Sequence, residues 1–275
     1  MDIDKIQLNH VLSESVQRSD VPAVAAQIST SEETIYRNEF GFSNFESKAL
    51  LKEDSLYRIA SMTKAITSVC VVQLIERGKL SLDSRLKDFF PHISKIKVLD
   101  GFDINNTAIY SKTKEDITVK HLLTHTSGFA YEIWNENILK LNNQGILSSA
   151  FSGDNKFLQS PLVNNPGAGW EYGIGIDWLG ALVEKITDMT LQDFMIKNIF
   201  IPLEMKDTSY DLDFSKQERL VSVHCRNGNR FSKLPFETPE DTNFYSGGGN
   251  LISSLNDYAN FLGMLLNYGN FKGKQ

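Results

Sequence analysis

The chain has 275 residues, of which 41% are apolar and 23% charged, and its net charge is −6. This composition supports a packed core and excludes a disordered chain, and the scattered lysines exclude a nucleic-acid surface. Two cysteines, Cys70 and Cys225, are too few for a disulfide framework or a zinc site. The first residues do not have the pattern of a secretory signal. No stretch of apolar residues is long enough to span a membrane. We therefore expect a cytoplasmic protein with no membrane span.

The N-terminal residues predict a helix followed by a hairpin. Apolar residues recur at helical spacing over residues 3–17. Residues 23–29 and 34–40 are strand-like and flank a polar turn at 30–33. A further strand-like segment, 56–60, runs directly into an apolar segment that predicts a buried helix ending near Gly78.

The middle of the chain is mixed. Thr118 is expected to cap a short helix that stops before Gly128. Residues 132–165 are polar and irregular, which predicts a mobile flap or a long surface loop. Residues 166–175 form a glycine-rich turn segment that leads into the next helix.

Three more helices are predicted in the C-terminal half. The first covers residues 176–186, and the second covers 191–200 and stops at Pro202. Ser254, followed by aspartate three residues later, is a helix start, and this third helix runs to Gly269.

Serine followed by lysine three positions later is the most informative pattern in the chain, because the two side chains share one face of a helix. Four such pairs occur: Ser61–Lys64, Ser84–Lys87, Ser94–Lys97 and Ser111–Lys114. Only Ser61–Lys64 stands between an apolar strand and an apolar helix; the others lie in charged or solvated segments. A lysine held in an apolar interior is a candidate base beside a hydroxyl nucleophile. The alternative is that Ser61 caps the helix and Lys64 reaches solvent.

Other chemistry-bearing residues are weaker candidates. His121 and His125 share the spacing of paired metal ligands, but no third ligand is nearby, so a structural role is favoured. The glycines at 247–249 lack the rest of a phosphate-binding loop and predict a tight turn. Tyr172, on its glycine-flanked loop, is by itself best interpreted as a partly buried aromatic side chain.

Four segments taken together, in this order, resemble one family. They are Ser61-Met-Thr-Lys64, His121-Leu-Leu-Thr-His-Thr-Ser-Gly128, Pro166-Gly-Ala-Gly-Trp-Glu-Tyr172 and Ser246-Gly-Gly-Gly-Asn-Leu251. The chain is similar to the serine β-lactamase-related proteins, which include class C β-lactamases, family VIII carboxylesterases, D-aminopeptidases and related acyltransferases.

The resemblance implies an α/β (α+β) fold of the β-lactamase/transpeptidase type, with an antiparallel sheet flanked by helices beside a mostly helical region. Residues 1–275 would form one such domain. Within it, residues 1–80 would carry the sheet and the nucleophile, 81–240 the helical region, and 241–275 the return to the sheet.

The resemblance also implies the roles of three residues. Ser61 would be the acylated nucleophile, and Lys64 and Tyr172 would be the bases that take and return its proton. No cofactor or metal is implied. The partner would be a small-molecule ester or amide, and the oligomeric state stays open.

Two departures from the family pattern bear on the substrate. Class C β-lactamases carry an asparagine two residues after the tyrosine, where this chain has Ile174. The family's third motif, Lys/His-Thr/Ser-Gly, does not follow residue 250. We therefore expect a chain that is truncated before its C-terminal strands, lacks one oxyanion donor, and is by itself weak, inactive or poorly folded.

The leading functional hypothesis is a serine hydrolase that cleaves small carboxylic esters through a Ser61 acyl-enzyme. The alternatives are a β-lactamase or D-amino-acid peptidase or transpeptidase, an acyltransferase, and a non-catalytic penicillin-binding-like scaffold.

Overall fold

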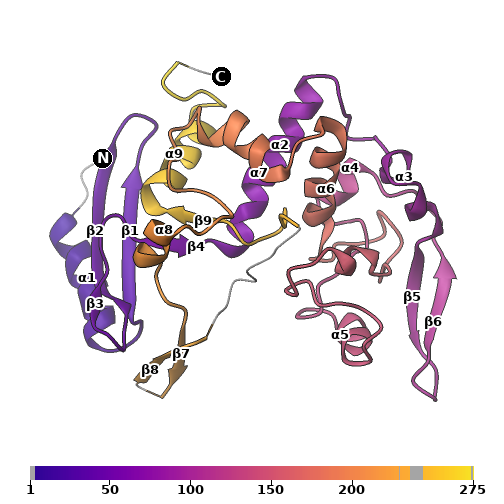
Figure 1. Ribbon diagram of the computed structural model, residues 1–275, viewed down its shortest axis with the longest axis horizontal. Coiled ribbons are helices and arrows are strands. Elements are labelled where there is room, and N and C mark those ends of the chain that lie inside the picture. The colour runs from indigo at the N-terminus through magenta and orange to yellow at the C-terminus, as the bar shows by residue number, and fades with distance from the viewer. Residues whose placement is uncertain (1–3, 229, 236–243, 274) are drawn as a thin grey trace. The chain divides into compact units, whose positions relative to one another are not determined.

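The computed structural model of the chain describes residues 4–228, 230–235, 244–273 and 275 (Figure 1). Its contacts divide it into two compact units, each built from segments that are distant in sequence. Unit 1 comprises Met1–Ile59, Ile196–Thr238 and Leu251–Gln275, and unit 2 comprises Ala60–Met195 and Pro239–Asn250. This division differs from the partition expected from the sequence, because it groups the segment after residue 60 with the helical region. A single β-lactamase-related domain stays a prediction.

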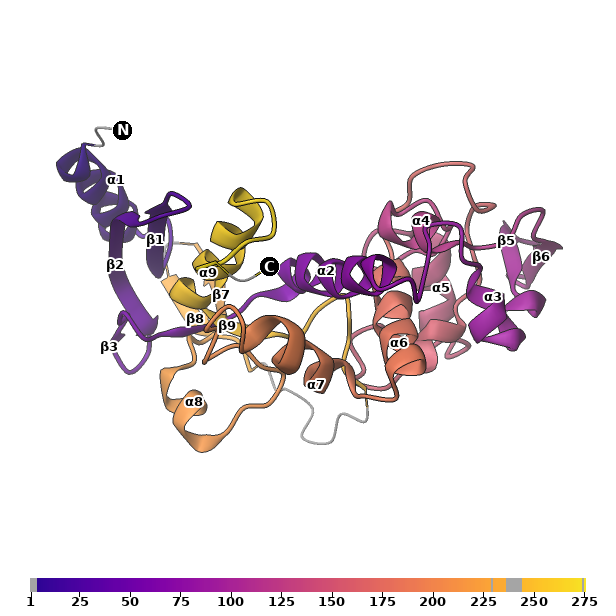
Figure 2. The same cartoon turned by 90° about the horizontal axis from the view of Figure 1, so that it is seen from above.

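Unit 1 contains an antiparallel sheet in the order β1 (Ala23–Ser29), β2 (Thr34–Asn44) and β3 (Ala49–Leu50). Helix α1 (Lys5–Gln17) contacts β1 and β2, and helix α9 (Leu255–Leu266) contacts β1. Figure 2 shows the two helices on opposite sides of the hairpin. The predicted N-terminal helix, the hairpin and the C-terminal helix are confirmed.

Shorter strands complete unit 1. Strand β4 (Leu56–Arg58) pairs antiparallel with β9 (Ile252–Ser254), and β7 (His224–Asn227) pairs with β8 (Arg230–Lys233). Helix α8 (Phe214–Arg219) precedes β7. The sequence did not predict β7, β8 or β9, because strands of three or four residues are too short to show a clear alternation of apolar and polar residues.

Three helices pack together in unit 2. Helix α2 (Thr63–Glu76) contacts both α6 (Gly175–Thr187) and α7 (Leu191–Met195). The chain after α7 continues as one π-helical turn, Ile196–Phe200. The predicted helix over 191–200 is therefore confirmed, but its second half is a π-helix rather than an α-helix. Helix α2 is less buried than predicted, since Val72 is 45% exposed.

The short helix α4 (Val119–Leu123) begins at the Thr118 cap as predicted and contacts α6. Hairpin β5 (Lys97–Phe102) and β6 (Ala108–Lys112) was not predicted, and Ser111 lies in β6 rather than in a loop. Two short helical segments, α3 (Leu86–Phe89) and the 3₁₀ helix Pro91–Lys95, precede this hairpin.

The segment predicted to be irregular, 132–165, contains helix α5 (Glu136–Asn143) and a 3₁₀ turn, Lys156–Gln159. Helix α5 buries Ile138 and Leu141 in a small core with Leu99 and Ala130. Two apolar residues three positions apart were too weak a periodicity to predict this helix.

The two cysteines are free; Cys70 is buried in α2 and Cys225 is exposed. Within the described part of the chain, no helix has the length and apolar character to cross a membrane.

Candidate active site

Ser61 and Lys64 lie together at the start of helix α2. Ser61 belongs to a 3₁₀ turn, Ala60–Met62, and is exposed, whereas Lys64 is half-buried in the first turn of the helix. The Lys64 Nζ lies 3.3 Å from the Ser61 Oγ. It also donates to the carbonyl oxygen of Gly248 at 2.6 Å. The alternative in which Ser61 caps the helix and Lys64 extends into solvent is wrong, since the cap residue is Met62 and Lys64 has two partners within the protein.

The backbone just before Ser61 is in an uncommon conformation. Ala60 has a φ of 45°, in the left-handed region that a residue with a Cβ adopts at a cost of about 1–2 kcal/mol. The Ser61 side chain, which follows directly, is exposed at the helix start. Such strained residues often lie at functional sites. The sequence contains no signal for this conformation.

Two tyrosine rings lie against the Lys64 amine. The Lys64 Nζ is 5.0 Å from the ring centroid of Tyr172 and 5.0 Å from that of Tyr131. The two ring centroids are 5.6 Å apart. Tyr172 is supplied by the glycine-rich loop, which packs so closely that a Cβ at Gly173 would lie 2.1 Å from the Phe129 carbonyl oxygen. The structure thus brings Ser61, Lys64 and Tyr172 into one cluster.

Tyr131 and Asp177 were missed by the sequence analysis. Asp177, in the first turn of α6, is 1% exposed and accepts hydrogen bonds from Tyr131, Ser246 and Gly248. Burial and the Asp177 carboxylate raise the pKa of the Tyr131 hydroxyl. A polar residue in the otherwise apolar stretch 174–183 was the available signal for Asp177. The sequence around Tyr131 contained no such signal, because only the folded chain brings Tyr131 next to Asp177 and Lys64.

The two histidines have structural positions, as predicted. The Nδ1 of His121 accepts from the Thr118 N–H at 3.3 Å and completes the N-terminal cap of α4. Among the described residues, no group of histidine, cysteine and acidic side chains could hold a metal ion.

His125 packs against the candidate site. Its ring centroid is 4.8 Å from that of Tyr172, and its Nδ1 accepts from the Gly173 N–H at 3.5 Å. Burial, together with the nearby Lys64 charge, lowers the pKa of His125 to about 4. His125 is therefore a neutral imidazole at neutral pH that supports the Tyr172 loop.

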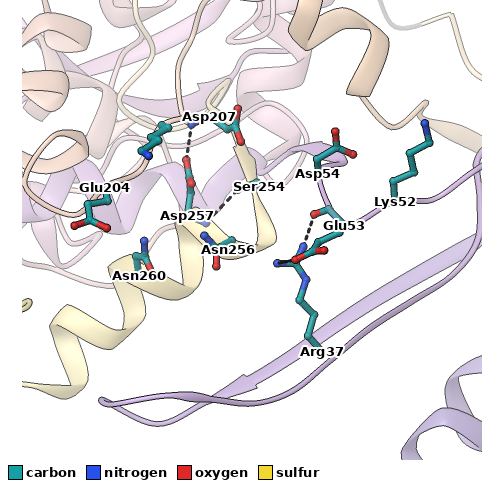
Figure 3. Close-up of a pocket in the computed structure, with 11 residues that line it drawn as sticks. Arg37, Lys52, Glu53, Asp54, Glu204, Asp207, Ser254, Asn256, Asp257 and Asn260 are labelled. Carbon is teal, nitrogen blue, oxygen red and sulfur yellow. Dashed lines mark hydrogen bonds and ion pairs between the residues drawn. The ribbon is translucent and has the colours of Figure 1, made fainter.

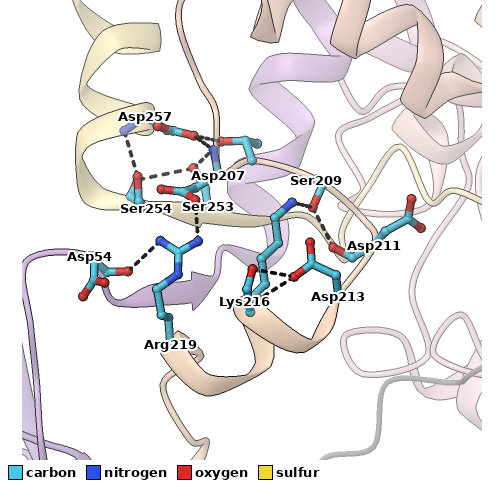
Figure 4. A network of polar contacts seen from close by, with 12 residues as sticks. Asp54, Asp207, Ser209, Asp211, Asp213, Lys216, Arg219, Ser253, Ser254 and Asp257 are labelled. Atoms are coloured by element: carbon cyan, nitrogen blue, oxygen red, sulfur yellow. Dashed lines mark hydrogen bonds and ion pairs between the residues drawn. The ribbon is translucent and has the colours of Figure 1, made fainter.

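A separate cavity of about 580 Å³ lies in unit 1 (Figure 3). Charged residues of both signs line it, and they pair within the protein: Arg37 bridges to Glu39 and Glu53, and Asp257 accepts from the Asp207 N–H. The neighbouring polar network in Figure 4 joins Arg219 to Asp207 at 2.5 Å. These contacts stabilise unit 1.

The chain is similar to known proteins of one family. Residues 8–274 match the β-lactamase family. Monacolin J acid methylbutanoyltransferase of Aspergillus terreus is 39% identical over 163 residues, which are 59% of this chain and 40% of that protein. Lovastatin esterase of Penicillium rubens is 37% identical over 162 residues, which are 58% of this chain and 40% of that protein.

Among solved structures, simvastatin synthase (LovD) from Aspergillus terreus, unliganded, superposes with a TM-score of 0.83 at 29% identity. The match covers 96% of this chain and 68% of that structure. The chain therefore belongs to the β-lactamase family, and the predicted α/β fold of the β-lactamase/transpeptidase type is confirmed. The chain spans about 40% of the length of the two curated relatives described above.

Proposed function

We propose that the chain provides a serine acyl-transfer site that cleaves small carboxylic esters through a Ser61 acyl-enzyme. The observation that carries the proposal is the cluster at the start of α2, where the Lys64 amine contacts the Ser61 hydroxyl and lies against the Tyr172 ring. Nucleophilic catalysis by serine requires a positioned base for the hydroxyl proton.

In the proposed mechanism, Lys64 and Tyr172 take the Ser61 proton as the Ser61 Oγ attacks the ester carbonyl. The carbon–oxygen bond of the ester breaks, and the leaving alcohol receives the proton. The acyl group is then transferred from Ser61 to water or to a second alcohol: the bases take a proton from this acceptor and give it to the Ser61 Oγ as the bond between the acyl group and Ser61 breaks. The N-terminal end of the α2 helix dipole favours a developing negative charge near Ser61.

Two exposed aromatic rings support an apolar ester as the substrate. Trp170 is 67% exposed and stacks on Tyr172, and Phe151 is 61% exposed and stacks on Tyr131. Met62, next to the nucleophile, is 47% exposed. Exposed apolar side chains beside polar catalytic groups are typical of sites that bind apolar molecules.

The residue two positions after Tyr172 supports an ester rather than a lactam. Ile174 is 2% exposed and begins helix α6, so it offers no polar group to a substrate amide. Because the relatives include a methylbutanoyltransferase and an esterase, transfer to an alcohol is the second candidate function.

The test has two parts. A fluorophosphonate probe should label the chain at Ser61, and Ser61→Ala should abolish the labelling; labelling that persists in this variant contradicts the proposal. Turnover of a nitrophenyl ester, a nitrophenyl ester with an added alcohol, and a chromogenic cephalosporin then separates hydrolysis, acyl transfer and lactam cleavage by product. Faster turnover of the cephalosporin than of the esters would overturn the choice of substrate class.

A further inference from the structure

A buried carboxylate lies at the back of the candidate site. The Oδ1 of Asp177 accepts from the Ser246 hydroxyl at 2.5 Å and from the Gly248 N–H at 2.9 Å, and its Oδ2 accepts from the Tyr131 hydroxyl at 2.8 Å. No ion pair to Asp177 is found among the described residues. A carboxylate removed from water is costly unless hydrogen bonds satisfy it. Neutral donors and the N-terminus of α6 therefore stabilise Asp177.

Gly248 connects this carboxylate to the Lys64 amine. Its N–H donates to Asp177, and its carbonyl oxygen accepts from the Lys64 Nζ at 2.6 Å. A Cβ at Gly248 would lie 2.5 Å from the Asp177 Oδ2 and 2.5 Å from the Tyr131 hydroxyl, so only glycine fits between them. The preceding carbonyl, of Gly247, accepts from the Thr67 hydroxyl at 2.8 Å. The loop at 246–248 is thus held by Asp177 on one side and by α2 on the other.

The same carboxylate distinguishes the two tyrosines beside Lys64. The Tyr131 hydroxyl donates its proton to Asp177, and burial and that negative charge raise its pKa. The Tyr172 hydroxyl has no hydrogen-bond partner among the described residues. The two tyrosines lie at the same distance from the amine but differ in chemistry. The Tyr131 hydroxyl proton is held in the hydrogen bond to Asp177, whereas the Tyr172 hydroxyl is available to exchange its proton.

We propose that Asp177 is a positioning residue that aims the Lys64 amine at Ser61 through Gly248 and keeps Tyr131 protonated, which leaves Tyr172 as the proton carrier. This inference rests on the proposed acyl transfer at Ser61. It assigns Asp177 no contact with the substrate, since all its effects pass through Gly248 and Tyr131.

The test compares the rate at which a fluorophosphonate probe labels Ser61 in the wild-type chain and in Asp177→Asn, from roughly pH 5 to 10. The amide keeps the size of the side chain and can still accept from Ser246 and Gly248, but its NH₂ group cannot accept the Tyr131 proton. We expect labelling to slow about 10- to 100-fold, the range found when partners that orient functional ligands are lost.

The pH profile separates positioning from a purely structural role. Without the Asp177 charge, the pKa of Tyr131 should fall, so Asp177→Asn should gain a pH dependence on the alkaline side. The double variant Asp177→Asn, Tyr131→Phe should lose that added dependence. An Asp177→Asn protein that folds and is labelled at the wild-type rate with an unchanged profile overturns the inference. Absence of labelling in the wild-type chain would instead contradict the proposed function.

Two further variants keep the inference testable if Asp177→Asn does not fold. Tyr131→Phe should slow labelling less than Tyr172→Phe does; a loss as large as that of Tyr172→Phe would show that Tyr131 is the proton carrier and overturn the inference. Asp257→Asn is the matched control, since Asp257 is also buried, at 3% exposed, in the first turn of a helix. It should lower the unfolding midpoint without changing the profile, and the same change of profile there would also overturn the inference.

Discussion

The two units each contain a serine hydroxyl hydrogen-bonded to a lysine amine, and the shorter contact is not the candidate site. In unit 1 the Lys216 Nζ lies 2.6 Å from the Ser209 Oγ (Figure 4), whereas in unit 2 the distance from Lys64 to Ser61 is 3.3 Å. Ser209 is 7% exposed, and its hydroxyl donates to the Asp211 carbonyl at 2.7 Å. Ser61 is exposed at a helix start.

The difference between the pairs is in what surrounds them. The Lys64 amine lies against two tyrosine rings, one of which can carry a proton, and the serine it contacts is open to a substrate. Lys216 extends from α8 to a serine whose proton is already committed to a backbone carbonyl. A serine close to a lysine is therefore not enough to make a candidate nucleophile. The hydroxyl must also be exposed, and a second proton carrier must lie nearby.

The largest expected effect comes from removing each lysine in turn. Lys64→Ala should reduce the rate of Ser61 labelling by about 10²–10⁴-fold, the usual contribution of a general base. Lys216→Ala removes a shorter hydrogen bond to a serine and should leave the labelling rate unchanged. Fluorophosphonate labelling followed over time measures both. Equal losses of labelling rate in the two variants would show that Lys64 is no more important than Lys216 for the reactivity of Ser61.

Two tyrosine hydroxyls sharpen the comparison further. Tyr172→Phe removes a hydroxyl without a hydrogen-bond partner among the described residues, so it should slow labelling about 100-fold with little change in the unfolding midpoint. Tyr36→Phe, in unit 1, removes the 2.8 Å hydrogen bond to Asn9. It should cost about 1 kcal/mol of stability and leave the labelling rate unchanged. Labelling rates and thermal unfolding of both variants check this; a Tyr172→Phe protein labelled at the wild-type rate would remove Tyr172 from the mechanism.

Parts of the candidate site could be predicted from the sequence because their signals are local. The apolar run before and after Ser61–Lys64 distinguished this pair from three others, and glycines around Tyr172 marked its loop. The pairing of Asp177 with Tyr131 could not be predicted, because the two residues meet only when α6 and the segment after α4 pack together. Sequence periodicity indicates which side of a helix is apolar. It does not indicate which polar side chains from different elements will contact each other in the fold.

The fold shows the same limit. Long periodic segments such as α6 and α9 were predicted correctly, since three or more turns give a clear apolar face. Strand β9 and helix α5 were missed, because each is short and takes its stability from tertiary partners: β9 from β4, and α5 from the core around Leu99. The left-handed backbone at Ala60 likewise results from its surroundings, as alanine has no preference for it.

Two glycines should respond in opposite directions to the addition of a methyl group. Gly248→Ala would place a Cβ 2.5 Å from the Asp177 Oδ2, so we expect a loss of about 1–3 kcal/mol of stability and slower labelling, because the carbonyl that holds Lys64 must move. At Gly263, within α9, no neighbouring atom lies within 4 Å of an added Cβ. Gly263→Ala should therefore stabilise the folded chain by about 0.5–1 kcal/mol. Denaturant midpoints measure both; a neutral Gly248→Ala would mean that the loop is loosely held.

The smallest expected effect concerns the pH dependence of stability at His125. Its pKa in the folded chain is lowered to about 4 by burial and by the Lys64 charge, against an ordinary value of about 6.5 when unfolded. Between these values the unfolded chain binds a proton that the folded chain does not, so stability is complete above about pH 6.5 and falls as the pH decreases toward 4. Below about pH 4 both states are protonated and this loss stops.

His125→Asn should remove this component and flatten the pH dependence of the denaturant midpoint between about pH 6.5 and 4 relative to wild type. Asparagine suits the site because it tolerates the φ of 55° and its side-chain oxygen can accept from the Gly173 N–H as the imidazole does. His10→Asn is the control for histidine replacement: the His10 side chain is 69% exposed, and its loss should leave the denaturant midpoint at neutral pH unchanged. If His125→Asn retains the full wild-type slope, the imidazole is already charged in the folded chain, and the Tyr172 loop must be supported by a cation rather than by a neutral ring.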